Sequence, residues 1–291
     1  IDWLGKSPYT KPAVSFLGGT SDAGRAPDAA PPPSGGPVTL LRKGHLAALL
    51  AWSSREGGDA EALWRGILLA VVGQPELALD ALETAQEGAT EGLRRLYLAW
   101  CQKALADPGR TLEFAAGALE LLLDPYHRVQ ALLLAAHGSW LLGRGKEAQE
   151  RFDEAAGCAA DGDLAVQVRC QQAAAALQDG EAERAAVLLA EARALLPAAP
   201  EPYTSFLLDV WTSLALKRAG SFEESLAPLE RAGRCAARHG LRSMEAWCDC
   251  EGGDTLRHLY RFDEALARLT RAADGARALG LGRLLEAARF N

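Results

Sequence analysis

A spacing of small residues recurs six times along the chain, and it constrains the fold more than any other feature. In each copy a small residue is followed by a second one twelve positions later and by a third seven positions after that. Side chains of this size let two helices approach closely, and such a period indicates stacked structural repeats. The eighteen residues are Gly66, Ala78, Ala85; Ala99, Thr111, Ala118; Ala136, Ala148, Ala155; Ala173, Ala185, Ala192; Ser213, Ser225, Ala232; and Gly253, Ala265, Ala272.

The residues around this spacing repeat as well. Residues 220–232 and 260–272 share the same order of acidic, apolar and small positions, forty residues apart. In five of the copies a large apolar residue stands three positions before the last small one, where we expect it to fill the gap between two helices. These residues are Leu82, Phe152, Leu189, Leu229 and Leu269.

From Val38 onward the apolar pattern is helical, in pieces separated by Gly, Pro or Asp, and alternating strand patterns are absent. The sequence therefore predicts an all-α fold with an extra helix over 38–54 and a capping helix from about residue 282. Six helix pairs are expected between them, beginning near Asp59, Gly92, Val129, Val166, Phe206 and Ala246.

This pattern resembles the tetratricopeptide repeat (TPR) family over about residues 59–280. The resemblance implies an α-solenoid of about six TPR-like antiparallel helix pairs in a right-handed superhelix. The repeat spacings of 33, 37, 37, 40 and 40 residues exceed the usual period of about 34. In this they resemble the TPR-like sensor arrays of bacterial maltose-activator-type transcription regulators. The sequence departs from the family at its first-helix aromatic position, which holds Arg95, Arg169, Asp209 and Asp249.

Residues 1–37 differ from the rest, because they hold seven of the 14 prolines and six glycines. Proline fixes φ and removes a hydrogen-bond donor, so we expect an extended segment here, acting as a linker or as a strap on the helical domain 38–291. The chain begins at Ile1 and ends as a new apolar pattern starts, which favours a piece of a longer protein.

The composition argues against two classes of function and indicates a cellular compartment. A formal net charge of −7 with no basic tract argues against direct nucleic-acid binding, and no apolar run is long enough for a membrane span. Six dispersed cysteines within helical patterns fit free thiols in a reducing compartment, so a cytoplasmic protein is expected. The resemblance to maltose-activator-type regulators implies a bacterial one.

Motifs for catalysis are missing. No histidine has a serine or cysteine in a recognisable nucleophile arrangement, and the acidic pairs begin second helices, where carboxylates favour the N-terminus. We therefore expect neither an enzyme nor a cofactor. A weaker alternative is a zinc site or enzyme using Cys235, His239, Cys248 and Cys250. Residues two apart on a helix point away from each other, however, so Cys248 and Cys250 cannot both face one ion.

In the resembling family the first helices line a concave groove, which implies an inner surface with an aromatic N-terminal half and a basic C-terminal end. It would bind a protein or peptide partner, such as an amphipathic helix, an extended peptide or the chain's own N-terminal segment. The family's clamp for chaperone tails is not expected, because its positions hold other residue types. The expected groove residues are Trp100, Lys103, His137, Trp140, Lys217, Arg218, Trp247, Arg257 and His258.

Two functions remain open at this point: an interaction scaffold, or the ligand-sensing domain of a larger bacterial transcription regulator. A homodimer through the last helices is also conceivable. A separate basic stripe (Arg231, Arg234, Arg238 and Arg242) recurs at helical spacing. It is either a solvated face or a contact surface for a partner.

Overall fold

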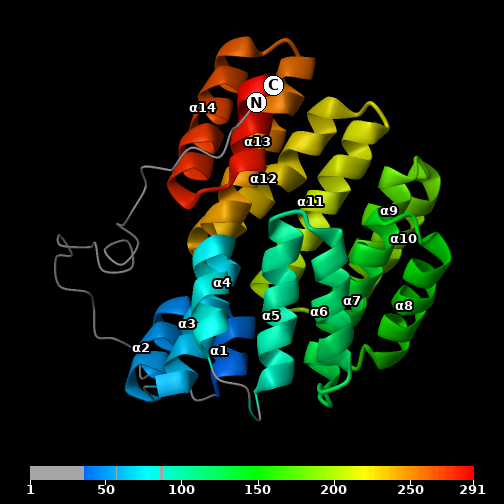
Figure 1. The fold of residues 1–291 in the computed structure, drawn as a ribbon. Helices are drawn as coiled ribbons and strands as arrows, with labels where there is room; N and C mark the ends of the chain where they lie inside the picture. Colours follow the sequence, from blue (N-terminus) through cyan, green and yellow to red (C-terminus); the bar gives the residue numbers. More distant parts are fainter. Residues whose placement is uncertain (1–35, 57, 86–87, 89) are drawn as a thin grey trace, which may run out of the picture. The chain divides into compact units, whose positions relative to one another are not determined.

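The computed structural model describes residues 36–56, 58–85, 88 and 90–291, and these contain helices but no strand. The expected extended segment 1–37 falls almost entirely outside this part. Fifteen helices follow one another in the described residues (Figure 1). They are α1 (Pro37–Arg42), α2 (Leu46–Glu56), α3 (Gly58–Val72), α4 (Pro75–Thr84), α5 (Glu91–Ala104), α6 (Pro108–Leu119), α7 (Pro125–Leu141), α8 (Gly145–Cys158), α9 (Gly162–Gln178), α10 (Ala182–Leu195), α11 (Pro202–Arg218), α12 (Phe222–Arg238), α13 (Arg242–His258), α14 (Phe262–Leu279) and α15 (Gly282–Phe290).

The helices from α3 to α14 pack as six consecutive pairs, which confirms the expected repeat architecture. Each predicted repeat start lies within the first helix of its pair, and α15 provides the expected capping helix. The single helix predicted over 38–54 is wrong, because the structure has α1 and α2 there. Gly44, with φ of +70°, separates them, since that conformation cannot continue a right-handed helix. The handedness of the superhelix stays a prediction.

All eighteen small residues of the repeat are buried between helices. At two of them even a methyl group has no room: a Cβ on Gly66 would lie 2.6 Å from Cγ of Leu82, and one on Gly253 would lie 2.5 Å from Cγ of Leu269. The five large residues of the pattern are also buried, with at most 8% exposed. The expected packing of small against large side chains therefore stabilises these five pairs.

The positions that depart from the TPR pattern form ion pairs within a repeat. In three repeats the charged residue on the first helix contacts an opposite charge 22 positions later on the second helix, and in another Arg95 packs against Gly117. At this surface each ion pair contributes little free energy, but it fixes the two helices in register. The pairs are Arg169–Glu191 (2.9 Å), Asp209–Arg231 (2.7 Å) and Asp249–Arg271 (2.7 Å).

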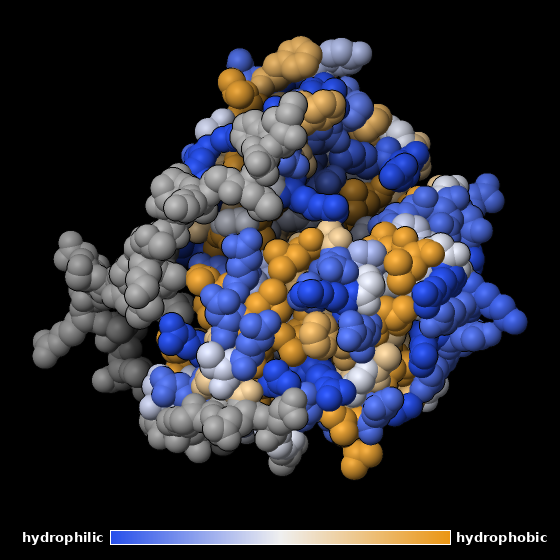
Figure 2. Space-filling view, viewed as in Figure 1, coloured by the Kyte–Doolittle hydropathy of each residue, from blue (hydrophilic) through white to orange (hydrophobic). Residues whose placement is uncertain are grey.

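None of the described helices combines the length and the apolar character that crossing a bilayer requires. Figure 2 shows hydrophilic side chains over most of one face, with apolar side chains in bands between them.

The turn between the two helices of a repeat requires a left-handed residue seven positions after the first small one. Four glycines and two other residues adopt it, with φ between +60° and +90°. An L-residue in this conformation is strained by about 1–2 kcal/mol, whereas glycine is not. The six residues are Gly73, Ala106, Gly143, Gly180, Gly220 and Tyr260.

We expect Ala106→Gly to raise the free energy of unfolding by about 0.5–1 kcal/mol, because the relief of strain exceeds the added entropy of the unfolded chain. The reverse change, Gly143→Ala, should lower it by about 1–2 kcal/mol. No atom lies within 4 Å of the added methyl group at Gly143, so backbone strain alone would act there. Urea denaturation measures both values, and a shift of both variants in the same direction would contradict this account.

Candidate functional site

The first helices of five repeats line a partly open cavity of about 470 Å³. Residues of α5, α7, α9, α11 and α13 line it, together with Phe152 of α8, and none of the lining residues is acidic. Its walls are mainly aromatic, as is common in sites for small or extended ligands. The aromatic lining residues are Trp100, Trp140, Phe152, Tyr203, Phe206, Trp211 and Trp247.

Aromatic contacts between distant repeats close this space. The ring centroids of Trp100 on α5 and Tyr203 on α11 lie 5.6 Å apart, although these helices belong to the second and fifth pairs. Trp247 on α13 extends the contact, with its ring 6.1 Å from both Phe206 and Trp211. The first helices therefore meet across the inner side, and the cavity between them is partly open to solvent.

Five of the nine expected groove residues line this cavity: Trp100, Lys103, His137, Trp140 and Trp247. Sequence reasoning placed Lys217 and Arg218 of α11 in the groove but missed the aromatic Tyr203, Phe206 and Trp211 of that helix, as well as Met244. A signal for α11 was present, because Tyr203, Phe206, Leu207 and Trp211 repeat at helical spacing and mark one face of a helix.

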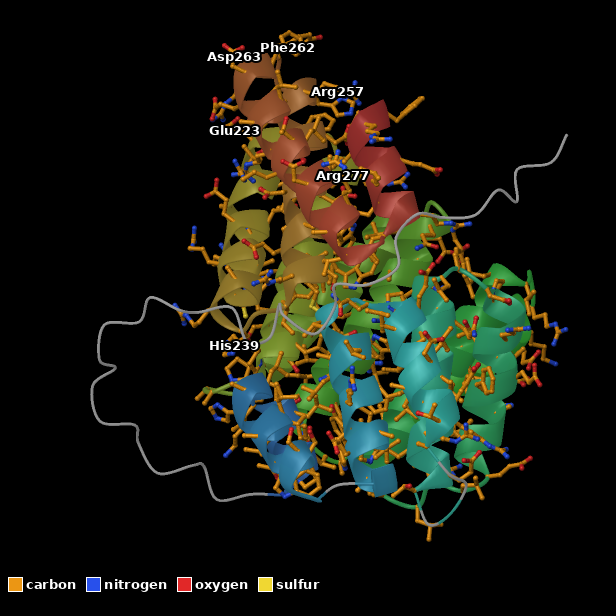
Figure 3. All side chains as sticks on the ribbon, turned by 60° about the vertical axis from the view of Figure 1, so that its left-hand side comes forward. Glu223, His239, Arg257, Phe262, Asp263 and Arg277 are labelled. Atoms are coloured by element: carbon orange, nitrogen blue, oxygen red, sulfur yellow. The ribbon has the colours of Figure 1, made fainter. Side chains whose placement is uncertain are left out.

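The other four expected residues lie elsewhere. Lys217 contacts Glu251 at 2.9 Å and Asp254 at 2.5 Å, and Arg257 contacts Asp254 at 2.7 Å. His258 stacks on Phe222, with ring centroids 4.7 Å apart, while Arg218 is exposed at the end of α11. The expected basic end is thus balanced by the carboxylates of α13. Arg257 follows Trp247 by ten residues, about 15 Å along the helix, near Phe262 and Asp263 (Figure 3).

Lys103 is the one ionised group that we find on the cavity wall. Among the described residues no carboxylate lies within ion-pair distance of it. Burial lowers the pKa of Lys103 to about 8, so the amine is still mostly protonated at neutral pH. Burial, followed by the charge of Lys103, lowers the pKa of His137 to about 3 and keeps that ring neutral. The cavity therefore carries a single positive charge.

The N-terminal helices contact the beginnings of α9 and α11 through Arg42. Its guanidinium pairs with Glu201 and, at 2.9 Å, with Asp161, and it lies 4.3 Å above the ring of Tyr126. Burial raises the pKa of Glu201 despite the opposing effect of Arg42. A partly buried, charged contact therefore joins α1 to the fourth and fifth helix pairs.

The alternative zinc ligands do not gather. No group of three or more His, Cys, Asp or Glu residues that could hold a metal ion occurs in the part of the chain that the structure describes. The Sγ of Cys235 contacts the Pro202 carbonyl oxygen at 3.5 Å, and Cys248 and Cys250 are buried. His239 lies at the opposite end of α12 from Glu223, beside the N-terminal helices (Figure 3). In the arginine stripe, Arg231 pairs with Asp209.

Several solved structures are similar to this chain, whereas no protein-family model and no curated protein matches it. A Rap protein in complex with the competence and sporulation factor has a TM-score of 0.61 at 14% identity, covering 87% of this chain and 79% of its own. The Cut9–Hcn1 hetero-tetramer of the APC/C has a TM-score of 0.58 at 12% identity, covering 87% of this chain and 48% of the other.

The third is a STAND protein with a tetratricopeptide repeat sensor from Pyrococcus horikoshii, with a TM-score of 0.56 at 15% identity. The match covers 85% of this chain but only 36% of that protein. At these identities the likeness concerns the fold alone, and it agrees with the helix pairs described above. The described part of the chain is a TPR-type α-solenoid.

Arg42 provides a test of the contact between α1 and the beginnings of α9 and α11. Arg42→Met keeps an apolar stem over Tyr126 but leaves Glu201 largely buried and unpaired, so the free energy of unfolding should fall by about 1–3 kcal/mol. Arg110 is the control, because its side chain is 66% exposed and 3.9 Å from its partner Asp107. Arg110→Met should change stability by less than about 0.5 kcal/mol in the same denaturation experiment. Equal changes in the free energy of unfolding for both variants would show that the Arg42 contact does not stabilise the fold.

Proposed function

Starting from this TPR-type fold, we propose that the protein is a non-catalytic binding scaffold. Its partner, a protein or peptide, would place apolar anchor side chains in the aromatic cavity. The observation that carries the proposal is the partly open cavity of about 470 Å³ with seven aromatic residues on its wall. Buried aromatic pockets of this kind supply most of the binding free energy at protein interfaces.

The titratable groups near the cavity support a binding role over a catalytic one. His137 has a pKa of about 3 and would be a poor base, and no carboxylate of the lining residues could assist it. Burial raises the pKa of the thiols of Cys101 and Cys170 to about 12. Thiols in this range are weak nucleophiles, because only the thiolate attacks.

The contact across the cavity favours a slender ligand. An α-helix with its side chains is about 10–12 Å wide. Trp100 and Tyr203 touch across the inner side, with ring centroids 5.6 Å apart, so a whole amphipathic helix would have to separate α5 from α11. An extended segment that inserts one or two side chains fits the space as it stands. The chain's own residues 1–35 stay a candidate occupant, although they lie outside the described part.

A second function, the ligand-sensing domain of a larger bacterial regulator, uses the same cavity. Its volume lies in the range of small-molecule sites, which is about 300–1,000 Å³. The similarity to the STAND protein favours this candidate, because the TPR part of that protein is described as a sensor. The match covers 36% of that longer protein. The four buried cysteines are free thiols and support a reducing, cytoplasmic setting. A homodimer remains a prediction.

Capture of partner proteins from host lysate tests the scaffold function by comparing wild type with the double variant Trp100→Ala/Trp140→Ala. It should reduce retention of a specific partner by about 10- to 100-fold, since truncating an interface anchor costs about 2 kcal/mol or more. The matched control is Tyr260→Ala/Phe290→Ala, because these aromatic side chains are 80% and 92% exposed and lie outside the cavity. All three proteins must have equal helicity by circular dichroism.

Retention by wild type and control, with loss in the cavity variant, is the expected result. Equal retention by all three would place the partner on another surface and contradict the proposal. Loss in the control variant alone would assign binding to the last helices instead.

A further inference from the structure

The unpaired charge of Lys103 narrows the chemistry of the ligand. We propose that the cavity selects a ligand whose apolar body carries a single carboxylate, with the Lys103 ammonium group as the counter-ion. This inference rests on the proposed use of the cavity for binding, and it adds the charge and the class of the ligand.

The first step is the contrast between two lysines on first helices. Lys217 on α11 has two carboxylate partners, Glu251 and Asp254, at 2.9 and 2.5 Å. Lys103 on α5 has none among the described residues, and the cavity that it lines contains no acidic side chain. A cation enclosed by apolar groups is unfavourable unless an anion accompanies it. The protein does not supply this anion from the described residues, so a bound ligand is the source that we assign.

The second step concerns the groups that line the cavity together with Lys103 from each surrounding helix. His137 on α7 is neutral near pH 7, and burial raises the pKa of Tyr203 on α11, so this phenol is neutral as well. α9 contributes Gln171, an uncharged amide that can donate a hydrogen bond, while α13 contributes Met244 and Trp247. These surroundings offer donors and apolar surface to a ligand but no competing negative charge.

The third step concerns the number of charges. One lysine can neutralise one negative charge, so a phosphate carrying close to two charges would leave a buried excess. A carboxylate matches the site in charge. The aromatic walls would hold the rest of the ligand, which must be apolar because Trp100, Trp211 and Trp247 surround it.

Isothermal titration calorimetry with a matched pair of probes tests this inference. N-acetyl-L-phenylalanine carries one carboxylate on an apolar body, and N-acetyl-L-phenylalaninamide differs only by lacking that charge. We expect the acid to bind wild type about tenfold more tightly than the amide, as for a charge-assisted hydrogen bond. Lys103→Met keeps the length of the side chain, and should bind both probes equally and as weakly as wild type binds the amide.

Lys146→Met is the control variant, because Lys146 is 93% exposed on α8 and is not part of the cavity. It should keep the tenfold preference for the acid. The preference of wild type should also disappear as the pH rises from about 7 to about 9.5. The pKa of Lys103 is about 8, and the neutral amine no longer attracts an anion above it. Binding of the amide should stay constant over this range.

Two further probes distinguish the sources of such a carboxylate. 3-Phenylpropionate represents a free organic acid, and the peptide acetyl-Gly-Gly-Leu-Phe represents the C-terminus of a protein. Tighter binding of the peptide assigns the cavity to a chain end, and tighter binding of 3-phenylpropionate assigns it to a small acid.

Equal affinity of wild type for acid and amide would overturn the inference about charge while leaving apolar binding in the cavity intact. Unchanged binding of the acid to Lys103→Met would overturn it as well. If neither probe binds wild type, the cavity does not accept this ligand class. The proposed scaffold function is then judged separately by the capture experiment with Trp100→Ala/Trp140→Ala.

Discussion

The close approach of two helices within each repeat is the contact on which the rest of this structure depends. It occurs where a small residue such as Gly253 faces a large one such as Leu269, with no room even for a methyl group. Because a small residue packs against a large one in this way in five of the six pairs, successive first helices present equivalent faces to the same side. Aromatic residues from α5 to α13 can therefore converge on one cavity, although they come from four different repeats.

Charged and aromatic residues lie on different sides of the repeats. Ion pairs such as Asp209–Arg231 occupy the position where related repeats carry an aromatic residue, and they hold the two helices of a pair in register. The aromatic residues lie instead on the inner side, around Lys103. This arrangement places a positive charge in apolar surroundings, where electrostatic interactions are stronger than at the surface. It suits binding, because an incoming anion would meet little competition from water.

Much of the fold was predictable from the sequence, because the helix pairs follow from local spacing of small and large residues. The break at Gly44 was not recognised, since one glycine in an apolar pattern does not reveal its φ. The site was predictable only in part. Trp100 and Trp140 follow from the groove positions of a repeat. The contact of Trp100 with Tyr203, however, joins distant repeats, and the pairing of Arg42 with Glu201 joins α1 to the beginning of α11. Such contacts depend on small rotations that add up from one repeat to the next. The prediction of a basic end at Lys217 was wrong for a related reason, because the acidic partners of Lys217 lie on the first helix of the next repeat.

The most direct measurement is a titration of the six lysine side chains by NMR, with ¹³C-labelled lysine and Lys103→Met to assign the resonance. The account predicts that Lys103 titrates near pH 8, well below a solvated lysine at about 10.4, because apolar groups enclose its amine without a counter-ion. Saturating N-acetyl-L-phenylalanine should raise this pKa. A Lys103 resonance that titrates near 10.4 without ligand would show a solvated amine. It would contradict the singly charged, apolar cavity on which the proposed ligand class rests.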